Sequence, residues 1–297
     1  DQIAGFGADQ VWVATFHATC MRILRRHIDR LGYDTNFTIY DTDDQKRVMK
    51  RVQKSLGIDD KFLNHRSILN EISHAKDSLI SPAEYKQTYQ NDFRKSKIAE
   101  CYREYQAELK RSDAMDFDDM IFNTVKLFKE NEDVLENYQM QFKYIIVDEY
   151  QDTSYAQYVL TYLLAGGYHN ICVVGDDDQS IYKFRGATIE NILNFEQEFS
   201  DCTVIRLEQN YRSTKTILNA ANAVIEKNQQ RKGKTLWTDN DKGRALQLYV
   251  LENEDEEGRL VAGTILDGVS AGRRYSDFAV LYRANAQSNA IERALVK

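Results

Sequence analysis

Two short apolar runs, each followed at once by acidic residues, constrain the fold of this chain more than any other feature. Residues 142–147 (Phe-Lys-Tyr-Ile-Ile-Val) precede Asp148 and Glu149, and residues 171–174 (Ile-Cys-Val-Val) precede Gly-Asp-Asp-Asp-Gln-Ser at 175–180. Short, nearly continuous apolar runs are typical of parallel strands that are covered on both faces. Open parallel sheets bind ligands beyond the carboxyl ends of their strands, so the sequence predicts a functional site there.

The acids at these strand ends indicate nucleotide chemistry. Carboxylates suit Mg²⁺, which is often held by one or two of them together with phosphates. Asp148 is the candidate Mg²⁺ ligand, and Glu149 is the candidate that orients or deprotonates an attacking water. The alternative is a solvated turn, which two acids alone would favour but which the longer string Val-Asp-Glu-Tyr-Gln-Asp disfavours.

A phosphate-binding glycine loop does not precede either apolar run. Gly233-Lys234-Thr235 imitates the end of such a loop, but position 228, where its first glycine would fall, is Asn228. A predicted helix also precedes this segment, whereas the loop requires a strand before it. This segment is therefore rejected as a phosphate loop.

The segment after the second run combines an amide, two aromatic rings and an arginine. Gln179 both donates and accepts hydrogen bonds, which suits a sensor of a γ-phosphate. Tyr182 and Phe184 lie in a stretch that should be polar, beside Arg185. Exposed rings there would stack on nucleic-acid bases, at about 1–3 kcal/mol each; the alternative is that they are core residues closing the loop.

Two further motifs are weaker when each is taken alone. Tyr211 could stack on a purine, and Arg212 could reach a γ-phosphate, because its planar fork donates two parallel hydrogen bonds. Thr15-Phe16-His17 follows an apolar run at 11–14 and precedes a basic helical stretch. This motif could hold a phosphodiester, although a helix with several arginines is usually a solvated face.

Composition sets broad limits. A length of 297 residues favours about two domains, and a net charge of -7 argues against binding nucleic acid by bulk charge. The sequence shows no membrane span or signal peptide. Its four cysteines lie far apart and indicate reduced thiols in a cytosolic protein.

Periodicity divides the chain into α/β and helical parts. Strands are predicted at 11–14, 142–147, 171–174, 203–207, 245–250 and 278–282, and helices near 155–165, 189–199 and 216–227. From about 41 to 137 helical periodicity dominates, and Ser81-Pro82 predicts a helix start. The chain begins about ten residues before an expected core strand, so both ends are interpreted as cut.

Together, these motifs resemble those of the UvrD/PcrA/Rep family of superfamily 1 DNA helicases. Residues 147–152 resemble the Walker B motif, 175–187 motif III, and 209–213 motif IV; segments 236–238 and 281–288 also fit the second motor domain. The resemblance covers nearly the whole chain.

The resemblance implies an α/β fold with RecA-like P-loop NTPase-type parallel sheets in two motor domains, both incomplete, and an all-helical insertion. The implied divisions are 1–40 and 138–207 for the first motor domain, 41–137 for the insertion, and 208–297 for the second motor domain.

It also implies roles for particular residues. Asp148 binds Mg²⁺, Glu149 activates water, and Gln179 couples the γ-phosphate to DNA. Tyr211 stacks on adenine and Arg212 touches the γ-phosphate. The implied DNA-binding residues are Thr15, Phe16, His17, Tyr182, Phe184 and Arg185.

The implied function is a fragment of an ATP-dependent 3′–5′ DNA helicase or translocase, with ATP and Mg²⁺ as cofactors. Its expected partners are single-stranded DNA, duplex/single-strand junctions and repair or replication proteins, in the cytoplasm and associated with the nucleoid. The phosphate loop and the last motifs are absent, and Phe184 stands where many relatives carry Trp. The chain alone is thus expected to be inactive as an ATPase; the alternatives are a silent single-strand or partner-binding module and the motor of a helicase–nuclease.

Overall fold

The computed structural model describes residues 11–228 and 233–296, and the chain divides into two compact units. The first unit comprises Asp1–Leu207 and Ile225–Lys234, and the second comprises Glu208–Val224 and Thr235–Lys297. Each unit is described by itself. None of the described helices is long and apolar enough to cross a membrane.

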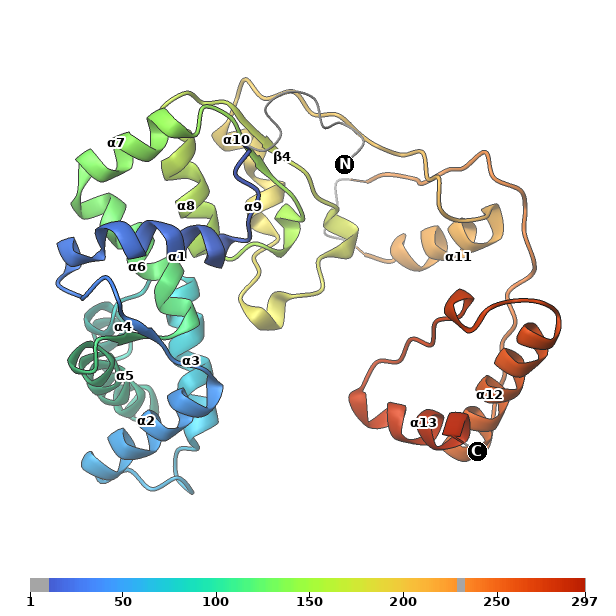
Figure 1. Ribbon diagram of the computed structural model, residues 1–297, viewed down its shortest axis with the longest axis horizontal. Helices are drawn as coiled ribbons and strands as arrows, with labels where there is room; N and C mark the ends of the chain where they lie inside the picture. The colour runs from blue at the N-terminus through green and yellow to red at the C-terminus, as the bar shows by residue number, and fades with distance from the viewer. Residues whose placement is uncertain (1–10, 229–232, 297) are drawn as a thin grey trace. The chain divides into compact units, whose positions relative to one another are not determined.

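The first unit is mainly helical (Figure 1). Its α-helices are α1 (Phe16–His27), α2 (Thr42–Ser55), α3 (His65–Asp77), α4 (Pro82–Thr88), α5 (Phe93–Arg111), α6 (Phe117–Glu130), α7 (Glu132–Gln141), α8 (Tyr155–Ala165), α9 (Glu190–Leu193) and α10 (Phe195–Glu198). The predicted helix at 155–165 is confirmed, and the one predicted at 189–199 is divided into α9 and α10.

Side-chain caps fix where several of these helices begin. The Ser81 hydroxyl accepts a hydrogen bond from the Glu84 amide, the Glu84 carboxylate accepts one from the Ser81 amide, and Pro82 occupies the first turn of α4. The helix start predicted at Ser81-Pro82 is therefore confirmed. Asp41, Asp116 and Ser154 form the same reciprocal arrangement at α2, α6 and α8, and each satisfies amides that a helix N-terminus leaves unpaired.

Two hydrophobic cores organise the first unit. One lies among α1, α6, α7 and α8, with Phe128 and Tyr138 among its fully buried side chains (Figure 1). The other lies among α2, α3, α4 and α5 and contains Tyr102 and Tyr105. The helical character expected from 41 to 137 is thus observed, while α6 and α7 contribute to the first core.

Parallel pairing is present but short. β3 (Ile145–Val147) pairs with β4 (Ile171–Val173) in parallel, with Val147 opposite Val173. β1 (Thr38–Ile39) pairs with β2 (Ala114–Met115), also in parallel. The two apolar runs therefore contain neighbouring parallel strands, as predicted. The expected cover on both faces is wrong, because Ile146 in β3 is 74% exposed.

The prediction of four strands is wrong, because these segments pair with no other strand among the described residues. Within 11–228 and 233–296, the segments 11–14, 203–207, 245–250 and 278–282 form no ladder. A strand needs a neighbour in register, and the described strands pair only as β1–β2 and β3–β4. Many of their apolar side chains are exposed, including Val13, Ile205, Leu248, Val250 and Leu281. Tyr144, directly before β3, and Ile146, within β3, are exposed as well.

A buried ionic cluster joins the two cores. The Lys76 Nζ atom on α3 lies 2.7 Å from Asp116 Oδ2 and 2.8 Å from Asp119 Oδ1, and all three side chains are at most 3% exposed. The Tyr105 hydroxyl donates to Asp116 Oδ2 at 3.0 Å, and Gln106 Nε2 donates to Asp119 Oδ1 at 2.9 Å. Burial opposes the Lys76 charge, but the two carboxylates outweigh it and raise the Lys76 pKa.

The second unit contains one closely packed helix pair. α12 (Glu254–Ser270) begins at the cap Asn253 with four acids in its first turn, which complements the helix dipole. It packs against α13 (Ser288–Val296), where a Cβ added at Gly258 would lie 2.7 Å from the Ala290 carbonyl oxygen. α11 (Lys215–Ile225) follows the Tyr211-Arg212 segment.

Candidate nucleotide and nucleic-acid site

The end of β3 presents the two acids that the sequence predicts to act on a nucleotide. Asp148 and Glu149 are both exposed, and Asp148 Oδ1 accepts a hydrogen bond from the Glu149 amide at 2.9 Å. Glu149 has a φ of 51°, in the left-handed region that non-glycine residues seldom adopt. This conformation turns the chain sharply at the strand end, into a 3-10 turn at Tyr150–Asp152.

The loop after β4 lies against this turn. The Tyr150 amide donates to the Val174 carbonyl oxygen at 2.9 Å, and Gly175 packs so closely that an added Cβ would lie 2.6 Å from Gln151 Oε1. Only glycine allows such an approach without displacing its neighbours. Residues 148–152 and 175–180 are therefore brought together, as the parallel-strand prediction requires.

Asp176 is the centre of the second loop. Its Oδ2 accepts from Gln179 Nε2 at 2.6 Å, and its Oδ1 accepts from the Asp178 amide at 3.0 Å and forms an ion pair with Lys234. Burial opposes the ionisation of Asp176, but hydrogen bonds from Lys234 and Gln179 outweigh burial and lower its pKa. Lys234, from the rejected phosphate-loop segment, thus contacts an acidic loop instead of forming a cradle.

Asp148 fits the chemistry of a Mg²⁺ ligand. Among the residues that the structure describes, its exposed carboxylate accepts one hydrogen bond, and a carboxylate offers about four acceptor sites. The carboxylates of Asp176, Asp177 and Asp178 also lie within 4.8 Å of one another. Asp176 and Asp177 are ion-paired with Lys234, at 3.6 Å for Asp177, so that group has an internal counter-charge.

The predicted stacking residues form a compact surface. The Tyr182 and Phe184 ring centroids are 6.0 Å apart, and their side chains are 36% and 70% exposed. The Arg185 guanidinium lies over both rings, 5.1 Å from the Tyr182 centroid and 5.6 Å from that of Phe184. These rings are therefore not core residues closing the loop, and a planar base could rest on them.

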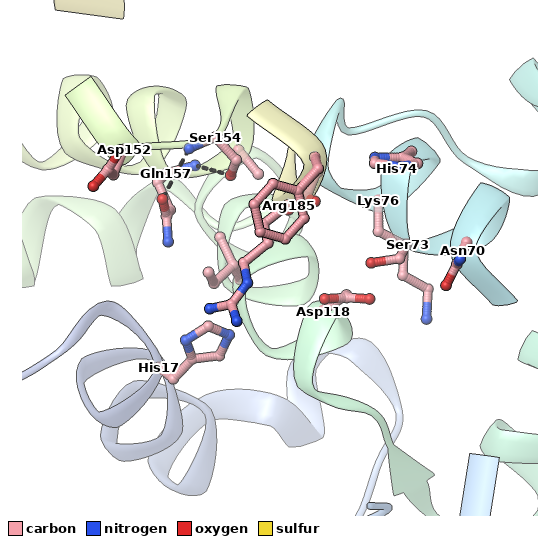
Figure 2. Close-up of a pocket in the computed structure, with 14 residues that line it drawn as sticks. His17, Asn70, Ser73, His74, Lys76, Asp118, Asp152, Ser154, Gln157 and Arg185 are labelled. Carbon is pink, nitrogen blue, oxygen red and sulfur yellow. Dashed lines mark hydrogen bonds between the residues drawn. The ribbon is translucent and has the colours of Figure 1, made fainter. Parts of the chain in front are cut away.

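His17 lies beside this surface. A cavity of about 550 Å³ lies between the start of α1, α3 and the 184–185 turn. Figure 2 shows Arg185 extending toward the His17 ring, with Asp118 beside it. Burial lowers the pKa of His17 despite the nearby Asp118, which favours the neutral imidazole. Its contact with DNA stays a prediction.

Thr15 and Phe16 have structural partners as well. The Thr15 hydroxyl accepts from the Ala18 amide at 3.2 Å and caps α1, while Phe16 packs against the first core. Their contact with DNA stays a prediction.

Tyr211 and Arg212 belong to the second unit. Tyr211 is 78% exposed, and its hydroxyl donates to Gln209 Oε1 at 2.8 Å. The Arg212 backbone amide donates to Asn210 Oδ1 at 3.0 Å. The Arg212 residue itself is exposed. The segment is braced by the Asn210 amide donating to the Trp237 carbonyl oxygen at 2.7 Å.

Sequence reasoning missed several side chains around the two loops. Gln151 was part of the Walker B string but received no role, although it contacts both Glu149 and Asp176. Asp77 and Asp118 received none because they lie in the helical part and far from any motif. No local sequence pattern marks them, and their half-buried positions become visible only in the structure.

Comparison with known families agrees with this geometry. Residues 2–200 match the model of the UvrD/REP helicase N-terminal domain, and residues 205–297 match that of the UvrD-like helicase C-terminal domain.

The chain belongs to the UvrD/REP helicase family.

Similar proteins of this family include three bacterial ATP-dependent DNA helicases PcrA. The chain is 50% identical to that of Bacillus subtilis (strain 168) and 48% identical to those of Staphylococcus epidermidis (strain RP62A) and Staphylococcus aureus (strain Mu50). Each match covers 100% of this chain but only 40%, 41% and 40% of the relative, respectively. The chain thus spans about two fifths of the length of these helicases.

Proposed function

We propose that this chain is a motor segment of an ATP-dependent DNA helicase or translocase that moves 3′ to 5′ on single-stranded DNA. The observation that carries the proposal is the meeting of two loops at one edge of the β3–β4 pair. One loop holds Asp148 and Glu149, and the other leads from Gln179 into the aromatic surface at 182–185. Residues suited to nucleotide chemistry therefore lie in loops that meet at one edge of the β3–β4 pair, and one of these loops continues into residues suited to base stacking.

On the nucleotide side, some residues would neutralise phosphate charge and others would orient the attacking water. Mg²⁺, when bound, would neutralise phosphate charge, and Asp148 is the side chain that would hold it. Glu149 would orient and deprotonate the attacking water, and Gln179 would sense the γ-phosphate. Tyr211 would stack on adenine and Arg212 would contact the γ-phosphate, as the family resemblance implies.

On the DNA side, Tyr182 and Phe184 would support bases while Arg185 and His17 contact the backbone. Stacking tolerates any base sequence, because every base has a π-face. The partners would be single strands and duplex/single-strand junctions, with repair or replication proteins, in a cytoplasmic and nucleoid-associated setting. The alternative is a silent single-strand-binding module, which would use the same surface without ATP.

The test is an ATPase assay on the gene's full-length product. Wild-type protein should hydrolyse ATP faster when single-stranded DNA is present, and Glu149→Gln should lower the stimulated rate at least 100-fold, because an amide cannot accept the proton from water. Glu136→Gln, on the exposed face of α7, is the matched control and should behave as wild type.

Two outcomes would contradict the proposal. One is a full-length protein with no DNA-stimulated ATPase, and the other is a Glu149→Gln variant with the wild-type rate. The 297-residue chain assayed alone should show neither tight ATP binding nor turnover, because it lacks the backbone amides and lysine of a phosphate loop.

A further inference from the structure

Gln151 connects the two loops of the candidate site through both ends of its amide. Its Nε2 donates to Glu149 Oε2 at 2.8 Å, and its Oε1 accepts from the Asp176 amide at 2.9 Å. Gln151 itself is 1% exposed, although its partner Glu149 is exposed. A buried amide with donor and acceptor both used is held in one orientation.

The connection continues toward the DNA surface. Asp176, whose amide bonds to Gln151, also accepts from Gln179 Nε2 at 2.6 Å. The Ser180 hydroxyl donates to the Gln151 carbonyl oxygen at 3.4 Å, and Tyr182 follows two residues later. A shift of the 175–185 segment would therefore change the acceptor geometry at Gln151, and with it the hydrogen bond to Glu149.

The left-handed backbone of Glu149 makes this hydrogen bond consequential. A residue held at a φ of 51° persists only where its surroundings over-determine it. Gln151 binds one carboxylate oxygen of Glu149 and leaves the other available to a water. As a neutral donor, it orients the carboxylate without adding a charge that would weaken it as a base.

We infer that Gln151 is a positioning residue that couples the Glu149 carboxylate to the DNA-contacting segment, so that DNA binding raises the rate of water activation. This inference rests on the proposed function, since it assigns a route for DNA stimulation at the same site. Gln151 touches neither substrate, and its effect passes through Glu149 and Asp176.

Two variants of the full-length protein test it. Gln151→Glu keeps the shape and can still accept from the Asp176 amide, but it replaces the donor to Glu149 by a second carboxylate. The carboxylate can no longer donate to Glu149, so the DNA-stimulated kcat should fall at least tenfold while the KM for ATP stays within about threefold of wild type. Gln151→Ala removes both bonds and should lower the DNA stimulation at least tenfold, with single-strand affinity within about threefold of wild type.

Gln45→Glu makes the same charge change on α2 and is the control for both readouts. If Gln151→Ala fails to fold, the kcat and KM values of Gln151→Glu decide. A wild-type kcat in Gln151→Glu together with wild-type stimulation in Gln151→Ala would overturn the inference while leaving the proposed function intact. Loss of DNA-stimulated ATPase in the wild-type protein would instead remove the proposed function itself.

Discussion

At the scale of single residues, the sequence showed which residue types suit a nucleotide or a base, but it did not show their geometry. The strings at 147–152 and 175–187 pointed to Glu149, Gln179 and the two rings because the residue types fit their tasks. The left-handed backbone at Glu149 and the two-ended bond of Gln151 depend on the approach of β4 and Gly175. Contacts between chain segments of this kind have no signature in local sequence.

Phe184 offers the sharpest test of the DNA surface. Phe184 is 70% exposed beside Tyr182. Phe184→Ala therefore removes a stacking face but little packing within the fold. We expect binding of the full-length protein to a fluorescent single strand to weaken by about 1–3 kcal/mol, or roughly 5- to 150-fold. Fluorescence anisotropy at several salt concentrations would measure it, and wild-type affinity should also fall as salt rises.

Phe93→Ala is the matched control for this measurement, because Phe93 is 71% exposed on α5 and lies outside the predicted DNA contacts. It should bind as wild type does. Equal affinities for wild type and Phe184→Ala, with no salt dependence, would argue against this surface as a DNA contact.

At the scale of elements, helices were more predictable than strands because their signals are local. Only a few neighbouring residues determine the helix start at Ser81-Pro82. The hydrophobic periodicity that predicts α8 is likewise local. Strands depend on partners far along the chain, and the segments at 11–14, 203–207, 245–250 and 278–282 have the composition of strands without a ladder. An apolar composition indicates that a segment would fit into a sheet. The segment forms a strand only where a second strand lies beside it in register.

The Lys76 cluster holds three elements together and predicts a large effect on stability. Lys76→Met would leave Asp116 and Asp119 buried without a counter-charge, so the free energy of unfolding should fall by about 3–5 kcal/mol. Urea denaturation followed by circular dichroism measures this. Lys54→Met, on an exposed position at the end of α2, should change stability by about 0.5 kcal/mol or less; a similar loss in both variants would contradict the argument.

At the scale of the molecule, the first unit has two cores whose junction is polar and partly buried. Asp77 at the end of α3 lies there, against Gly186 of the 182–187 turn, which has a φ of 84°. Burial, with a contribution from Asp118, raises the pKa of Asp77 to about 7. The sequence indicated a helical stretch between α/β segments, but it could not show which helices share a core or which acids meet at the junction.

This junction predicts how stability depends on pH. A carboxyl whose pKa is higher in the folded state stabilises the fold most below its unfolded pKa of about 3.9. Asp77 should thus lower stability as pH rises from about 4 through about 7. Asp77→Asn should flatten the decline, measured as the urea midpoint across this range. Asp43→Asn, exposed on α2, should keep the original slope, and an unchanged slope in Asp77→Asn would contradict the prediction.

The two-stranded ladder of β3 and β4 has a practical consequence. Among residues 11–228 and 233–296, no further strand covers its flanks, and Tyr144 and Ile146 are 79% and 74% exposed. Unpaired strand edges with exposed apolar side chains can pair with other chains. We therefore expect self-association of this 297-residue chain to compete with its folding. Stability measured for this chain should therefore depend on its concentration, which a dilution series would show.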